Sequence, residues 1–183
     1  LWFEKLGHFT KIENLKFFER FIKYVVPKIH TFVDNWNIIN EFNLGNSPER
    51  IKYKLNMIKY HALGYHTVKQ YSNAPISSAH AFVNYFPYRK YDRFDNLMTE
   101  FADFRDHEFF FHAICTGEIL SPLHDGEYYP DAKDAIDYWA VNYYTRDMID
   151  SRKADLKGKR FLHKQLKMIP MDFYLEEMYP EGL

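Results

Sequence analysis

The sequence predicts an α/β fold in which parallel strands are joined by helical crossovers. Apolar residues recur at helical spacing in three stretches, and a short β-prone run follows each of them. The order helix, strand, helix, strand, helix, strand is the pattern of βαβ units. At 183 residues the chain is long enough for one domain and short for two, so we expect residues 1–183 to form a single domain.

The first helix is predicted from Asn14 to Val33. Its apolar residues follow the three-and-four spacing of one helical face: Leu15, Phe18, Ile22, Val25, Ile29 and Phe32. Pro27 is expected to kink this helix or to end it nearby. The run from Trp36 to Asn40 is β-prone and ends in polar side chains, which indicates the first strand.

The second helix is predicted to begin at Ser47 and Pro48, an N-cap followed by proline at the first helical position, and to run to about Tyr71. A second strand is expected from Ile76 to Val83. Helical spacing returns from Phe94 to Ile114, although three consecutive phenylalanines blur its period.

Proline and glycine residues indicate a loop from Leu120 to Asp134. The third strand is expected from Tyr138 to Tyr144, because this run is rich in aromatic and β-branched residues. The basic and polar stretch from Asp147 to Lys167 is expected to be an exposed loop.

Charge and composition restrict the possible partners. The chain has 24 Lys and Arg against 25 Asp and Glu, so we expect neither a nucleic acid nor a membrane as partner. The single cysteine, Cys115, lies in an apolar stretch, so we expect a buried side chain and a reducing, cytoplasmic location. The first residue is not Met, so we expect the chain to begin inside a longer gene product or after processing.

His107 and His112 flank a glutamate in a pattern similar to a zinc motif. They are five residues apart, whereas two histidines on one face of a helix are separated by four. We therefore expect no metal and no cofactor.

The strongest candidate for chemistry is Asn40-Glu41, at the end of the first predicted strand. Ligand sites of parallel α/β folds lie at the carboxyl ends of the strands, where these two residues are expected. Taken alone, such a pair is more often a polar strand end than a catalytic site.

The octet from Trp36 to Asn43 resembles the acid/base motif of glycoside hydrolase family 1, the β-glucosidases and related β-glycosidases, in which Asn-Glu-Pro follows an apolar strand. Further segments resemble the family in the expected order: Leu1 to Gly7, Gly117-Glu118, Gly126-Glu127, Asn142 to Arg146, and Tyr179 to Leu183. The resemblance implies a (β/α)8 barrel in which the three predicted strands are the fourth, fifth and sixth.

The resemblance also implies a retaining β-glycosidase that acts on β-glycosides or oligosaccharides. Glu41 would be its general acid/base, and Asn40 would donate a hydrogen bond to the sugar 2-hydroxyl. Tyr144 would orient the nucleophile carboxylate, and Asn142 would contribute to substrate binding. Phe42 replaces the proline of the motif, and we expect it to add bulk close to the carboxyl group of Glu41.

The nucleophile of the family lies in a segment that we expect beyond Leu183. Three strands of an eight-stranded barrel would leave open edges. We therefore expect a complementary chain, further segments or a homo-oligomer to complete the barrel. The alternative is a noncatalytic barrel fragment that self-associates or binds a partner through open strand edges.

Overall fold

The computed structural model describes residues 5–44, 50–121, 123–152, 168–170, 175–177 and 179–182. The chain falls into two compact units. Unit 1 comprises Leu1–His80 and Phe109–Val141, and unit 2 comprises Ala81–Glu108 and Asn142–Leu183. Two long strands begin in unit 1 and continue into unit 2: β3 (Ala79–Pro87) and β6 (Ala140–Ile149).

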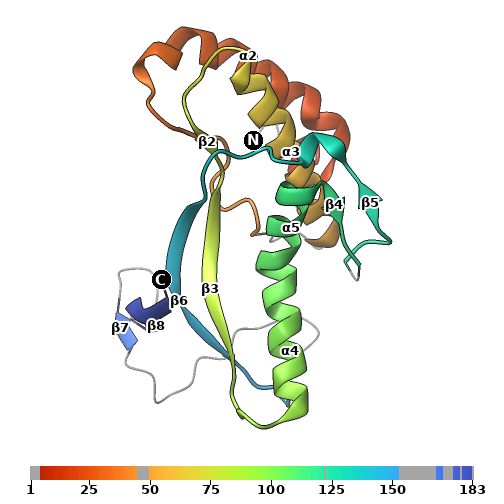
Figure 1. The fold of residues 1–183 in the computed structure, drawn as a ribbon, viewed down its shortest axis with the longest axis vertical. Helices are drawn as coiled ribbons and strands as arrows, with labels where there is room; N and C mark the ends of the chain where they lie inside the picture. Colours follow the sequence, from red (N-terminus) through yellow and green to blue (C-terminus); the bar gives the residue numbers. More distant parts are fainter. Residues whose placement is uncertain are drawn as a thin grey trace. The chain divides into compact units, whose positions relative to one another are not determined.

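Unit 1 is built around two helices, α2 (Leu15–Ile29) and α3 (Arg50–Lys69), which pack against each other (Figure 1). Two short parallel strands accompany them, β1 (Trp36–Asn37) and β2 (Ile76–Ser77). The remaining elements of unit 1 are α5 (Phe109–Thr116), the antiparallel pair β4 (Glu118–Ile119) and β5 (Glu127–Tyr128), and 3-10 turns at His8–Thr10, Ile12–Asn14, His30–Phe32 and Pro130–Ala132.

A hydrophobic core of unit 1 lies between the two helices and the paired strands. Four buried side chains form its centre: Ile22, Val26, Val68 and Ile76. The apolar face of α2 supplies the first two, which its helical periodicity places one turn apart. Gly64 of α3 allows a close approach, because a Cβ there would lie 2.7 Å from Cγ2 of Ile38.

Unit 2 contains most of β3 and β6, which pair side by side (Figure 1). Just past the end of β3, the N–H of Tyr88 donates to the carbonyl of Ile149 at 2.9 Å, so the carboxyl ends of the two strands meet. The other elements of unit 2 are α4 (Arg93–Asp103), a π-helical turn (Phe104–Glu108), the antiparallel pair β7 (Met168–Pro170) and β8 (Leu175–Glu177), and a 3-10 turn at Pro180–Gly182.

The three predicted helices are confirmed. The first ends at Ile29, shortly after Pro27, and a 3-10 turn follows it. The predicted cap at Ser47 lies outside the described residues. The third helix is α4, the π-helical turn and α5, and the change of helical pitch at Phe104–Glu108 accounts for the blurred apolar period.

The positions of the three predicted strands are confirmed, but their observed lengths differ from the predicted ones. Regular pairing in the first stops at Asn37, whereas β3 continues to Pro87 and β6 to Ile149. The expectation of an exposed loop from Asp147 is therefore wrong at its start, because Asp147 lies within β6 and is 2% exposed. The loop expected from Leu120 to Asp134 contains β5 and a 3-10 turn.

Cys115 is exposed, so the expectation of a buried thiol is wrong. The buried side of α5 carries Phe110, Ala113 and Ile114, and Cys115 lies off that side although its neighbours in sequence are apolar. In the part of the chain that the structure describes, no helix combines the length and the apolar character needed to cross a membrane.

Candidate functional site

Asn40 and Glu41 form a bulge at the end of the first strand. The N–H of Ala79 donates to the carbonyl of Ile39 at 2.9 Å, and the carbonyl of Ala79 accepts from the N–H of Phe42 at 3.3 Å. In a regular parallel ladder, a residue such as Ala79 bonds to two residues of the neighbouring strand that have one residue between them. Here Ile39 and Phe42 have two residues between them. Bulges of this kind re-aim side chains, and they are common beside active sites.

The backbone of Glu41 is left-handed, with φ of 52°. A residue with a Cβ pays about 1–2 kcal/mol for this conformation, and such strain is found preferentially at functional sites. A turn holds it, since the N–H of Leu44 donates to the carbonyl of Glu41 at 3.0 Å. The side chain of Glu41 is half-buried and that of Asn40 is exposed, so both are within reach of a ligand.

Phe42 anchors the bulge in unit 1. Its side chain has no exposed surface, and its ring stacks on His61 with centroids 5.5 Å apart. It also meets the rings of His80 at 5.6 Å and Phe110 at 5.1 Å, both edge to face. The bulk that the sequence suggested near the carboxyl group of Glu41 therefore fills the core of unit 1, where it fixes the residue after Glu41.

Asn43 extends this anchor with polar contacts. Its Nδ2 lies 3.1 Å from Nε2 of His80, and its carbonyl accepts a hydrogen bond of 2.6 Å from Nζ of Lys54. Lys54 is 5% exposed, and its ammonium lies 5.1 Å from the ring centroid of Phe110. A buried ammonium needs such partners, so Lys54 ties α3 to the segment that carries Glu41.

His61 on α3 packs against the ring of Phe42 and is itself held by two hydrogen bonds. Its Nε2 lies 2.7 Å from the carbonyl of Ala135, and its Nδ1 lies 2.7 Å from Oγ of Ser78. A carbonyl can only accept, so Nε2 donates and the hydroxyl of Ser78 donates to Nδ1 in the neutral imidazole. Burial lowers the pKa of His61 to about 4, with a smaller contribution from nearby His66 and against the hydrogen bond to Ala135. The ring is therefore neutral at pH 7.

Sequence reasoning missed Lys54 and His61. They are seven residues apart on α3, which places two polar side chains on the same face of the helix. That spacing was the available signal, but only the tertiary packing distinguishes a buried polar face from a solvated one.

Asn142 and Tyr144 lie in unit 2, on the same side of β6. Asn142 is half-buried and Tyr144 is 41% exposed, while Thr145 and Asp147 on the other side are buried. Tyr144 was expected at a strand end, but it lies in the middle of β6. The structure thus brings Asn40 and Glu41 together in unit 1, and Asn142 and Tyr144 together in unit 2.

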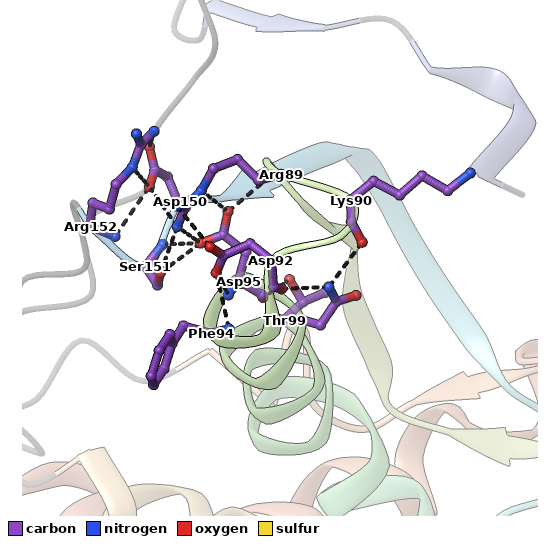
Figure 2. Close-up of polar contacts among 10 residues, drawn as sticks. Arg89, Lys90, Asp92, Phe94, Asp95, Thr99, Asp150, Ser151 and Arg152 are labelled. Atoms are coloured by element: carbon purple, nitrogen blue, oxygen red, sulfur yellow. Dashed lines mark hydrogen bonds and ion pairs between the residues drawn. The ribbon is translucent and has the colours of Figure 1, made fainter.

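A second polar cluster, the Asp95 clasp, lies in unit 2 (Figure 2). It consists of Arg89, Asp92, Asp95, Asp150, Ser151 and Arg152. Asp95 has no exposed surface, and its carboxylate accepts from the guanidinium of Arg89 at 2.8 and 2.9 Å and from the hydroxyl of Ser151 at 2.6 Å. These hydrogen bonds, that with Arg89 above all, hold the pKa of Asp95 well below its usual range.

The clasp joins the carboxyl ends of β3 and β6 and starts α4. Asp92 caps the helix by accepting from the N–H of Phe94 at 3.0 Å and that of Asp95 at 3.1 Å. Arg152 pairs with Asp150 at 2.8 Å, so each carboxylate of the cluster has a cationic or backbone partner within the protein. The clasp is therefore a structural element.

The histidines of the apparent zinc motif have other roles. His107 lies in the π-helical turn, with Nε2 at 2.8 Å from the carbonyl of Val83, and His112 pairs with Glu118 at 3.0 Å. Among the residues that the structure describes, no three His, Cys, Asp or Glu side chains gather as metal ligands would.

No family model matches the chain. A β-galactosidase of Saccharolobus solfataricus is 27% identical over 190 aligned positions, which cover 91% of this chain and 38% of that protein.

Two solved structures are similar to the chain as a whole. A β-glycosidase from Pyrococcus horikoshii matches with a TM-score of 0.81 and 23% identity, over 99% of this chain and 45% of its own. A family 1 β-glucosidase from Thermotoga maritima matches with a TM-score of 0.78 and 16% identity, over 98% of this chain and 45% of its own. The chain therefore shares the fold of part of these proteins and spans less than half their length.

Proposed function

We propose that this chain, which resembles the central portion of a family 1 glycoside hydrolase barrel, carries the general acid/base of a retaining β-glycosidase. The observation that supports this proposal best is the bulge that presents Glu41 at the carboxyl end of β1. In barrel enzymes, catalytic groups lie at this end of the strands. The strands β1, β3 and β6 would be the fourth, fifth and sixth strands of the barrel.

Glu41 acts twice in the proposed reaction. Its carboxylic acid protonates the glycosidic oxygen while the bond to the anomeric carbon breaks and the sugar passes to a second carboxylate, the nucleophile. The resulting carboxylate of Glu41 then takes a proton from water as that water attacks the anomeric carbon and releases the sugar. The nucleophile comes from a segment outside these residues.

We assign three other residues a role in the same reaction. Asn40 donates a hydrogen bond to the sugar 2-hydroxyl, an interaction that can strengthen in the transition state. Tyr144 orients the nucleophile carboxylate by hydrogen bonding, and Asn142 contributes to binding the substrate. The substrate is a β-glycoside or an oligosaccharide, and complementary segments or a further chain complete the barrel. The expected cytoplasmic location stays a prediction.

The test compares Glu41→Gln with Glu13→Gln, which removes an exposed carboxylate of the same unit. The assay uses the protein assembled with the segments that complete its barrel and an aryl β-glucoside with an activated leaving group. We expect Glu41→Gln to accumulate the glycosyl-enzyme, because an activated leaving group needs no acid but water needs a base. Azide, which needs no base, should restore turnover and yield a glycosyl azide.

Full activity of Glu41→Gln without azide contradicts the acid/base assignment. Inactivity of both variants and of the parent protein contradicts the glycosidase proposal itself. Glu13→Gln should behave as the parent does in every arm.

A noncatalytic role is the second candidate. In that role a partner strand adds to an edge of the sheet formed by β3 and β6. Hydrogen exchange of the β6 amides in the isolated chain and with a candidate partner distinguishes the two roles. Protection of that edge on binding, in a protein without hydrolytic activity, supports the noncatalytic reading.

A further inference from the structure

One side of α4 is apolar and exposed. Phe94, Leu97, Met98 and Phe101 follow helical spacing along it, and they are 70%, 59%, 36% and 37% exposed. Tyr91, just before the helix, is 90% exposed. The opposite side of the helix carries the buried Asp95 and Ala102. The five exposed residues are called the α4 face: Tyr91, Phe94, Leu97, Met98 and Phe101. An exposed apolar run of this length commonly marks an interaction surface.

The charges beside the α4 face change sign along the helix. Lys90 and Arg93 are exposed at its start, and Glu100 is exposed near its end, with Asp103 half-buried in the last turn. Arg93 and Glu100 are seven residues apart and so lie on the same flank of the apolar residues. Among the described residues, neither of them forms a salt bridge within the chain.

We propose that the α4 face binds the α4 face of a second copy of this chain, with the two helices antiparallel. A two-fold axis near Leu97 places the apolar residues of the two copies in contact. In antiparallel helices the same flank of each helix faces its counterpart, so Arg93 of each copy lies beside Glu100 of the other. The pairing therefore buries the apolar run and satisfies both charges at once.

The second exposed aromatic surface, on α2, lacks this complementarity. Phe21 and Tyr24 are 61% and 67% exposed on that helix. The charges around them are mostly basic: Lys16, Arg20, Lys23 and Lys28, with Glu19 already paired to Lys23 at 2.6 Å. Two copies of α2 would bring like charges together, whereas two copies of α4 bring opposite charges together. The charge pattern therefore favours α4.

The pairing does not depend on catalysis, so it can fail or hold independently of the proposed function. Sedimentation equilibrium of the full chain over a wide range of concentrations tests it. We expect the average mass to rise from that of one chain toward that of two. Leu97→Glu should abolish this rise, and Phe21→Glu on α2, the matched control, should leave it unchanged. Circular dichroism confirms that each variant folds.

Charge exchange gives the sharper test. Arg93→Glu and Glu100→Arg should each weaken the dimer about tenfold, because each single change puts like charges at two symmetric positions. The double variant should return to within about threefold of the parent, since the pairs re-form with exchanged sign. A monomer at every concentration overturns the proposal. So does association that is insensitive to Leu97→Glu and to the charge exchange, which is the result expected for pairing through strand edges.

Discussion

The ring of Phe42 stacks on the imidazole of His61, with centroids 5.5 Å apart and planes inclined by 24°. Neither side chain has exposed surface, and Phe42 directly follows Glu41. The position that is proline in the resembled motif is therefore a core position in this chain. The rigidity that proline would give to the backbone comes here from packing between the strand end and α3.

Replacement of Phe42 should be costly whichever residue is introduced. Phe42→Ala removes a buried ring and should lower the free energy of unfolding by about 3–5 kcal/mol. Phe42→Pro introduces the residue of the resembled motif, yet it leaves a cavity and removes the N–H that donates to Ala79. It should therefore destabilise by about 3 kcal/mol or more. Urea unfolding measures both, and Phe32→Ala, at a ring that is 85% exposed, should stay within about 0.5 kcal/mol of the parent.

His61 should make stability depend on pH in the mildly acidic range. Its pKa is lowered from 6.5 to about 4 in the folded chain, so the unfolded chain binds more protons between these values. Stability should rise with pH from about 4 to 6.5, by about 3 kcal/mol in all, because a pKa difference of one is worth about 1.4 kcal/mol. Unfolding free energies at several pH values measure this slope. His61→Gln should lower the free energy of unfolding at pH 7. It should also remove the part of the pH slope that corresponds to about one bound proton, and an unchanged slope contradicts the assignment.

Gly64 should resist substitution although it lies inside a helix. Alanine favours a helix by about 1 kcal/mol over glycine, but its Cβ would lie 2.7 Å from Ile38 and 3.2 Å from Phe18. We expect Gly64→Ala to destabilise by about 1–2 kcal/mol in total, because overpacking outweighs propensity. A double-mutant cycle with Ile38→Ala provides the check. If the clash is the cause, Gly64→Ala should cost less, or even stabilise, once Ile38 is truncated.

Replacement of Asp95 should destabilise the chain. Asp95→Asn keeps its size but weakens the contacts with Arg89 and Ser151, and should cost about 2–4 kcal/mol. Because the pKa of Asp95 is lowered in the folded chain, its contribution is present above the unfolded value near 4 and is lost as pH falls below it. Acid unfolding of the parent and of the variant measures this contribution. Glu108→Gln, at an exposed carboxylate, is the matched control and should behave as the parent does.

The helices and the position of the candidate site could be predicted because their signals are local. The three-and-four spacing of α2 depends only on residues within the same helix, and the structure follows it closely. Strand ends carry weaker signals, since a strand continues as long as a neighbour pairs with it. β6 extends past Tyr144 to Ile149 because it pairs with β3 over that length. The residue types after Tyr144 do not predict this extension.

The sequence by itself determined the α/β order of elements and the location of Asn40 and Glu41 at a strand end, because periodicity and strand order are properties of neighbouring residues. The tertiary structure alone decided that these two residues bulge opposite Ala79, and that Phe42, His61 and Lys54 are buried behind them. Burial and register depend on partners distant in sequence, such as Phe110 and Ala135. The backbone that presents Glu41 is therefore a product of packing rather than of the motif that contains it.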